Sequence, residues 1–451
     1  MGLLAGCTPG TEPAPRPNVL FIVADTLRAD HLGLYGSRHD TSPNLDAFGR
    51  ANLTFLRPVS PAPWTSPAVA SLFTSLYPSA HGVVSPAVGS GMPNDSLAES
   101  YTTLAEQFSS AGYATRALIA NPWVSRLRGY AQGFDSFVDV AVLLEQGNAT
   151  PTTDELRRMA TDELRRLKAE GQPFFFYLHF LDPHSPFSAP SELVDRFHPQ
   201  GAKRPKKPNN LGKISEQVAQ YNAEIFVLDE AIGELFAFLR AEGLYDDLII
   251  AFTSDHGEQF WEHGQFGHGH TVYSEEVYVP FLLKARGQKG EVAEVVSTLD
   301  VGPTLLAAAG LERLPNSQGV PLPSDLHVRK ERGALTEATM KRNFKALVTE
   351  LGEKWVVEFN APANELVDES KERAVIGFYE WGNDGKGKEV PIDASRTQAL
   401  RTQFYEQLAE SAMLRDDAEA APVKLDAGTI EALKALGYGE MGEASGTSPG
   451  D

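Results

Sequence analysis

One apolar run and the polar cluster behind it constrain the fold of this chain more than any other feature. The run Leu248–Thr253 is followed directly by Ser254–Glu258, which reads Ser-Asp-His-Gly-Glu. A continuous apolar run of this length is typical of a strand buried on both faces of a parallel sheet. The carboxyl ends of such strands form the edge where open α/β folds build their sites. The sequence therefore predicts an α/β fold with a functional site after residue 254.

Histidines concentrate in the loop that follows this strand. Four of the 11 histidines in the 451-residue chain fall within 15 positions, at His256, His263, His268 and His270. The alternative is a Gly-rich polar surface loop that happens to hold histidines. We favour a metal or catalytic site, because imidazole serves both as a metal ligand and as an acid or base near neutral pH.

Two further segments bring reactive side chains to the same edge. Residues 18–24 form a second apolar strand, which ends at Asp25. Residues 62–74 turn sharply and enter a helix, with Pro67 near its first turn. Thr65 would then lie by the helix N-terminus, where backbone N–H groups and the helix dipole favour an anion.

The side chains expected to meet at this edge offer three oxygens and one imidazole: Asp25, Thr65, Asp255 and His256. Such a set suits a divalent metal, and a hydroxyl on a metal loses its proton more easily and becomes a better nucleophile. The carboxylates favour Ca²⁺, Mg²⁺ or Mn²⁺, whereas the imidazole favours Mn²⁺ or Zn²⁺.

These segments resemble, in order, the sulfatase branch of the alkaline phosphatase superfamily. Besides those around Asp25 and Thr65, the matching segments are Phe180–Phe187, Ser254–Glu258, Gly267–His270, Tyr278–Phe281, Leu299–Leu306 and Ala435–Tyr438. The resemblance covers nearly the whole chain. It implies a large mixed, mostly parallel sheet sandwiched by helices, as in alkaline phosphatase, with a small C-terminal α+β subdomain. It also implies a hydrolase acting on sulfuric or phosphoric esters.

The chain departs from the formylglycine-dependent sulfatases at the nucleophile. Those enzymes have a Cys, or sometimes a Ser, that is oxidised to formylglycine and is followed by x-Pro-x-Arg. Here Thr65 cannot give formylglycine, and Val69 stands where the family has the Arg. Thr26 replaces the second acid of the usual N-terminal pair, and residues 119–123 lack the family's Lys and His.

What remains is similar to the threonine-nucleophile relatives, namely nucleotide pyrophosphatases/phosphodiesterases, phosphoethanolamine transferases and lipoteichoic acid synthases. The resemblance implies that Asp25, Asp255 and His256 hold the metal, with Thr65 as fourth ligand and nucleophile. Attack on phosphorus would give a phosphothreonine that water or a second alcohol resolves. A phosphoester is therefore the favoured substrate, and a sulfate ester remains open.

Three more residues complete the predicted catalytic set. Asn121 would donate to a non-bridging substrate oxygen, or alternatively cap the turn before Pro122. His184 resembles the family's histidine that contacts the transferred group or the leaving oxygen. His268 falls near the family's Lys that contacts sulfate, with His270 as the neighbouring choice.

A second metal is an alternative use of the remaining polar residues. Its ligands would be Asp182, His184, His268, His270 and His263. Two metals about 3.5–4 Å apart would clamp the attacking and leaving oxygens. His179, which faces away from its strand neighbours, is interpreted as a satisfied interior histidine.

The periodicity of apolar residues predicts the order of elements. Strands are expected at 18–24, 114–120, 173–180, 247–254 and 278–285, and helices at 67–76, 97–111, 153–170, 215–242 and 299–310. Short antiparallel strands are expected at 345–348, 354–359 and 365–367. We predict an N-terminal tether at 1–17, a catalytic domain at 18–325, a C-terminal subdomain at 326–440 and a disordered tail at 441–451.

The net charge of the chain and its single cysteine give expectations about its binding partners and its location in the cell. The net charge of −20 argues against nucleic acid, so the expected partner is an anionic ester of a small molecule, glycan or lipid headgroup. Cys7 ends the stretch Leu3–Cys7, which resembles a bacterial lipobox. We therefore expect a lipid anchor at the cell envelope or periplasm, with an ordinary N-terminus as the alternative.

Two other function classes are weighed against a hydrolase. A transferase of the phosphoethanolamine transferase type would pass the same phosphoryl group to an alcohol rather than to water. A catalytically inactive binding protein would keep only the fold. The second class is disfavoured, because a dead site has no need to bury four ligand groups unpaired.

Overall fold

The computed structural model describes residues 16–84, 96–140, 152–198, 210–340, 342–361, 365–381, 387–389 and 394–415. Cys7, the segment Ala435–Tyr438 and the expected tail at 441–451 lie outside the described residues. Within the described part of the chain, no helix combines the length and apolar character needed to cross a membrane.

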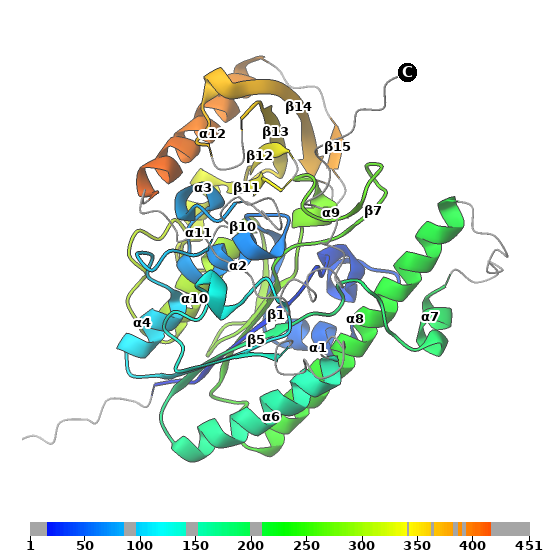
Figure 1. The fold of residues 1–451 in the computed structure, drawn as a ribbon, viewed down its shortest axis with the longest axis vertical. Coiled ribbons are helices and arrows are strands. Elements are labelled where there is room, and N and C mark those ends of the chain that lie inside the picture. Colours follow the sequence, from blue (N-terminus) through cyan, green and yellow to red (C-terminus); the bar gives the residue numbers. More distant parts are fainter. Residues whose placement is uncertain are drawn as a thin grey trace, which may run out of the picture.

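An eight-stranded sheet forms the centre of the molecule (Figure 1). Its strands lie in the order β10 (Gly290–Ser297), β2 (Leu53–Val59), β9 (Phe281–Lys284), β6 (Ile249–Ser254), β1 (Val19–Ala24), β5 (Phe174–Phe180), β3 (Ala114–Ile119) and β4 (Ser136–Asp139). Only β9 runs antiparallel to its two neighbours among these strands. The predicted mixed, mostly parallel sheet is confirmed.

Helices cover both faces of this sheet because the central strands are apolar on both sides. Along β1, Leu20 and Ile22 face one layer, and Phe21 and Val23 face the other. The first layer contains α1 (Pro43–Ala51), α6 (Thr153–Glu170) and α8 (Asn210–Ala241). The second contains α2 (Thr65–Thr74), α4 (Leu104–Ser110) and α10 (Val301–Ala308). The central strands are thus buried from both sides, as the apolar runs predicted.

A smaller antiparallel sheet packs at one end of the molecule, at the top of Figure 1. Its strands are β11 (Ala334–Ala338), β12 (Asn343–Val348), β13 (Glu353–Phe359), β14 (Glu372–Trp381) and β15 (Gly387–Glu389). One face packs on α12 (Ala394–Leu414) through Leu400 and Phe404. The opposite face contacts Val272, in the loop after β8 (Phe266–Gly267). This sheet therefore touches the histidine-rich loop.

The remaining helices are short. They are α3 (Pro78–His81), α7 (Ser191–Phe197), α9 (Ser274–Val277) and α11 (Leu326–Arg332), together with the 3₁₀ turns η1 (Ala29–His31), η2 (Gly33–Tyr35), η3 (Arg126–Arg128), η4 (Thr298–Asp300) and η5 (Glu369–Lys371). A two-stranded hairpin of β7 (Gln259–Phe260) and β8 follows the central strand β6.

Several predicted boundaries are wrong for identifiable reasons. The helix expected from 97 begins only at Leu104, because Thr103 and Glu106 form a capping box. The helix expected from 67 begins at Thr65, and the helix expected from 215 begins at Asn210. Residues 365–367 are not a strand; the chain next pairs in the sheet at β14.

A buried histidine in α3 makes stability depend on pH. Val83 N–H donates to His81 Nδ1 at 3.1 Å, so the proton must sit on Nε2, which lies 3.0 Å from Ser71 Oγ. Burial lowers the pKa of His81 from 6.5 to about 3. Because this pKa is depressed in the folded state, the stabilisation is complete above pH 6.5 and is lost as pH falls toward 3.

We expect His81→Gln to flatten the acid side of the stability profile. Wild-type free energy of unfolding should lose up to about 1.4 kcal/mol per pH unit below about 6.5 through this one group, and the variant should lack that component. Urea denaturation at a series of pH values measures it. His39→Gln, at an exposed histidine, is the matched control. Identical slopes for His81→Gln and wild type would contradict this account.

Candidate active site

The candidate site lies where β6, β1 and β5 end side by side. Ala24 is in register with Phe180 on β5 and with Ser254 on β6, so all three strands end level. Asp25 and Asp255 follow directly on neighbouring strands. Their side chains and those of Thr65 and His256 are completely buried. The topology therefore brings together residues that are up to 231 positions apart in the sequence.

Thr65 stands at the first residue of α2, on the sheet face that this helix covers. Its Oγ1 lies 3.2 Å from His256 Nε2 and 3.4 Å from Asn121 Nδ2. Trp64 precedes it in an extended conformation, and its ring packs edge-on against Trp123 at 5.5 Å. The hydroxyl is thus held at a helix N-terminus beside an imidazole, as the sequence predicted.

Asn121 caps the turn, which is one of the two alternatives considered for it, and its amide nitrogen also faces the site. Its Oδ1 accepts a hydrogen bond from Trp123 N at 2.7 Å, which caps the turn. Its Nδ2 donates to Asp25 Oδ2 as well as pointing at Thr65. The capping bond fixes the amide so that its donor side faces the site.

Backbone contacts orient the Asp255–His256 pair. Asp255 Oδ1 accepts from His256 N at 2.8 Å and from Thr26 N at 3.2 Å. His256 Nδ1 lies 2.9 Å from the carbonyl oxygen of Gly257, which assigns the proton to Nδ1 and leaves the Nε2 lone pair free to coordinate. That Nε2 is 3.5 Å from a carboxylate oxygen of Asp25 and 3.5 Å from one of Asp255.

The donor set fits a divalent cation. Within the described part of the chain, Asp25 Oδ1, Asp255 Oδ2 and His179 Nε2 are buried without a hydrogen-bond partner. One ligand atom from each of these three residues lies within 4.8 Å of the others. Burial raises the pKa of Asp25 well above its ordinary value, and the Asp255 carboxylate raises it further. Burial also raises the pKa of Asp255 to about 6. A cation would offset both penalties.

His179 is the site residue that the sequence interpretation missed. It is interior as predicted, but it is not fully satisfied. Its Nδ1 lies 2.9 Å from Tyr177 Oη, whereas Nε2 lies 3.9 Å from Asp25 Oδ2. Burial lowers its pKa to about 4, so the ring is neutral and Nε2 can act as a ligand. The sequence signal that could have identified His179 is its position one residue before the end of β5, at the edge of the sheet where the site lies.

The predicted catalytic histidines lie beside the metal-site residues. The His268 ring is 4.4 Å from that of His256 and 5.1 Å from that of His184, centroid to centroid. His268 Nδ1 lies 3.4 Å from each carboxylate oxygen of Glu258. Burial raises the pKa of Glu258 to about 7 and lowers that of His184 to about 3. Glu258, which was not predicted as a site residue, therefore orients His268.

The second-metal alternative is not supported by the geometry. His263 stacks on Tyr273 at 3.8 Å and pairs with Glu275 at 3.2 Å, so its inclusion in a metal cluster is wrong. His270 Nε2 lies 3.2 Å from the carbonyl oxygen of Phe266. Among the described residues, no second group of three ligands converges as Asp25, His179 and Asp255 do.

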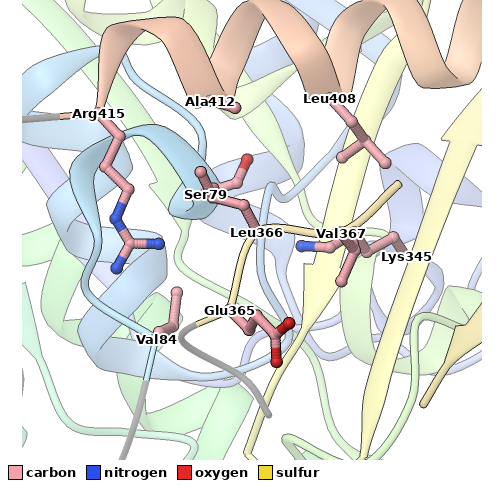
Figure 2. A pocket seen from close by; sticks show the side chains of 9 residues that line it. All are labelled: Ser79, Val84, Lys345, Glu365, Leu366, Val367, Leu408, Ala412 and Arg415. Carbon is pink, nitrogen blue, oxygen red and sulfur yellow. The ribbon is translucent and has the colours of Figure 1, made fainter. Parts of the chain in front are cut away.

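A small pocket lies elsewhere, in the C-terminal subdomain between α3, α12 and β12 (Figure 2). Its lining residues are Ser79, Val84, Lys345, Glu365, Leu366, Val367, Leu408, Ala412 and Arg415. None of them belongs to the candidate site, and the Lys345 ammonium in this pocket is paired with Glu337. This pocket is therefore separate from the residues gathered at the sheet edge.

The central sheet, with buried acid, imidazole and threonine groups at its edge, has the alkaline phosphatase-like architecture of the sulfatase fold. The chain belongs to the sulfatase family, whose model matches residues 17–311. It is 28% identical over 334 residues to the ulvan-active sulfatase of Formosa agariphila, an alignment that covers 67% of this chain and 63% of that protein.

Further similarities involve proteins with different names. The chain is 29% identical over 386 residues to the multifunctional alkaline phosphatase superfamily protein PehA of Trinickia caryophylli, covering 66% of this chain and 74% of that protein. Among solved structures, it resembles that of BT4656 in complex with D-glucosamine-2-N,6-O-disulfate, with a TM-score of 0.70, 17% identity and coverage of 90% and 100%. The phosphonate monoester hydrolase of Agrobacterium radiobacter gives a TM-score of 0.66, 22% identity and coverage of 88% and 96%. These likenesses establish the fold.

Proposed function

We propose that this chain hydrolyses an anionic ester by attack of Thr65 on the transferred group, with phosphoesters preferred over sulfate esters. The observation that carries the proposal is the placement of Thr65 Oγ1, buried at a helix N-terminus 3.2 Å from His256 Nε2. An alcohol is a weak nucleophile until its proton is removed or its pKa is lowered. Asp25, Asp255, His256 and His179 would hold a divalent metal, which would supply that activation and balance the charge of the substrate.

The remaining side chains have separate tasks in this proposal. Asn121 Nδ2, aimed at Thr65, would donate to a non-bridging oxygen of the bound ester. His184 and His268 would face the leaving oxygen, and Glu258 would fix the orientation of His268. Water would then attack the threonine ester to release the product.

The preference for phosphorus rests on the identity of the nucleophile. Thr65 carries a single oxygen on Cβ, so the transferred group can leave only when a second nucleophile attacks phosphorus or sulfur. A formylglycine hydrate has a second oxygen on the same carbon and escapes this requirement. The preference is supported by one structural neighbour, whose name is that of a phosphonate monoester hydrolase.

The substrate and location follow as parts of the same proposal. The neighbour bound to a sulfated glucosamine supports a small-molecule or glycan ester. The lipobox-like stretch ending at Cys7 supports a lipid-anchored protein of the cell envelope. Labelling with a radioactive fatty acid, compared with Cys7→Ser, tests the anchor.

A panel of three p-nitrophenyl esters tests the preference: the sulfate, the phosphate monoester and a phosphodiester. Protein loaded in turn with Ca²⁺, Mn²⁺ or Zn²⁺ is assayed for each. We expect kcat/KM for the better phosphoester to exceed that for sulfate by at least about tenfold, or about 1.4 kcal/mol of transition-state stabilisation. Turnover of the sulfate ester alone would overturn the preference.

A further inference from the structure

The chain segment that carries His268 is held by one buried carboxyl group. Glu276 lies in α9 (Ser274–Val277) and is completely buried. Its Oε2 accepts from His270 N at 2.9 Å, and its Oε1 accepts from Thr271 N at 3.1 Å and from Thr271 Oγ1 at 2.7 Å. Glu276 therefore binds the chain directly beyond His268 and Gly269.

The same residue also holds the segment that follows the central strand β6. Gln259 Nε2 donates to Glu276 Oε1, and the Glu276 carbonyl oxygen accepts from Gly257 N at 2.8 Å. Gly257 and Gln259 flank Glu258, which lies 3.4 Å from His268 Nδ1. Figure 1 shows α9 beside β7, where these contacts are made. Glu276 thus joins the two segments whose contact places His268.

A further attachment holds the His268 segment against the nucleophile segment. Gly269 N donates to the carbonyl oxygen of Pro63 at 2.8 Å, two residues before Thr65. The His268 ring lies next to this attachment, with its centroid 4.4 Å from that of His256. The position of the His268 ring therefore depends on a backbone that is held from two sides.

The hydrogen bonds of Glu276 make its carboxyl group hard to replace. His270 N, Thr271 N, Thr271 Oγ1 and Gln259 Nε2 are all donors, so both carboxyl oxygens act as acceptors. A glutamine amide would turn its NH₂ group toward at least one of these donors. Burial raises the pKa of Glu276 to about 8 although these hydrogen bonds lower it, so burying the charged form is costly. This costly group stands where the segments of the site meet.

We propose that Glu276 is a positioning residue for the reaction, which sets the place of His268 relative to His256 and thereby the assistance that His268 gives to the leaving oxygen. This inference rests on the proposed function, because that function assigns His268 to the leaving oxygen. Glu276 acts through the segments that it holds and takes no part in bond breaking.

The test compares a good and a poor leaving group in the ester class that the wild type turns over faster. Metal-loaded protein is assayed with the p-nitrophenyl and phenyl esters, because departure of the poorer leaving group depends more on proton donation. His268→Ala should lower kcat/KM for the phenyl ester by about 10²-fold and much less for the p-nitrophenyl ester. Glu276→Gln should lower it by about tenfold for the phenyl ester and by less than about twofold for the other. In the His268→Ala background, Glu276→Gln should add no further selective loss.

Two further variants separate positioning from folding. Thr271→Val removes one donor to Glu276 and should reproduce the selective loss on a smaller scale, about threefold, even if Glu276→Gln does not fold. Asp229→Asn alters a buried carboxylate that accepts from Asn44 N and Leu45 N, and it should lower stability without changing the ratio of the two esters. Stabilisation by added metal should persist in Glu276→Gln, because the proposed ligands remain.

Equal losses for the two esters in Glu276→Gln and Thr271→Val would show a merely structural role and overturn the inference. An unchanged phenyl ester in both variants, or a full additional loss in the double variant, would also overturn it. A selective loss in His268→Ala alone would leave the proposed function standing. No turnover by the wild type, or no selective loss in His268→Ala, would contradict the proposed function, and the inference would fall with it.

Discussion

Thr65→Ala is expected to lower kcat on the best p-nitrophenyl ester by at least about 10³-fold. The substitution removes the hydroxyl to which the proposal assigns the attack, an oxygen that lies 3.2 Å from His256 Nε2. Helix α2 should persist, because alanine is a better helix former than threonine. Steady-state kinetics and circular dichroism on the same preparations separate loss of chemistry from loss of fold.

Two further variants control this experiment. Thr74→Ala makes the same chemical change at the other end of the same helix, where the hydroxyl donates to the Ala70 carbonyl at 2.7 Å and accepts from Leu76 N at 3.3 Å. It should keep turnover within a few-fold of wild type. Thr65→Ser keeps a hydroxyl and should retain part of the rate. If Thr65→Ala retained more than about a tenth of wild-type kcat, Thr65 would not be the nucleophile.

Asp255→Asn is expected to abolish the stabilisation that metal confers. The wild-type site holds two buried carboxylates whose pKa values are raised by burial, so a bound cation should stabilise the folded state strongly. At a metal concentration of 100 times Kd, that stabilisation is about 2.7 kcal/mol. Thermal unfolding with added Mn²⁺ and with chelator measures it. The variant should show no metal-dependent shift and should lose turnover by a factor of about 10² or more.

Asp229→Asn is the matched control for that variant. Asp229 is also a buried aspartate, but its carboxylate accepts from Asn44 N and Leu45 N at the start of α1. Its substitution should lower the melting temperature with and without metal alike, and leave the metal-dependent shift intact. A metal-dependent shift of wild-type size in Asp255→Asn would show that the cation binds elsewhere.

The sequence predicted the central strands well because their physical signal is local. Strands β1, β5 and β6 are apolar on both faces, and such runs need no tertiary information to be recognised. Strands β2, β4 and β10 of the central sheet were missed. β2 contains Arg57-Pro58, and β10 alternates exposed and buried residues at the edge of the sheet. Propensity and periodicity are weakest for such strands.

The site residues show the same division between local and tertiary information. Asp25 and Asp255 were found because each directly follows an apolar strand. His179 was not found. Alternation along the strand places His179 on the face opposite Leu178, but it does not show which helix packs on that face. Only the packing of α2 on the sheet puts Thr65 there. His263 was predicted as a ligand because it lies close to His256 in the sequence. In the fold its ring stacks on Tyr273 instead.

Trapping the covalent intermediate tests the central claim most directly. Metal-loaded wild-type protein is mixed with the best ester, quenched in acid within the first turnovers, digested and analysed by mass spectrometry. The account predicts a phosphoryl or sulfuryl group on the peptide that contains Thr65, located on that residue by fragmentation and absent from Thr65→Ala. Turnover without any modified Thr65, or a modified residue elsewhere that persists in Thr65→Ala, would contradict it.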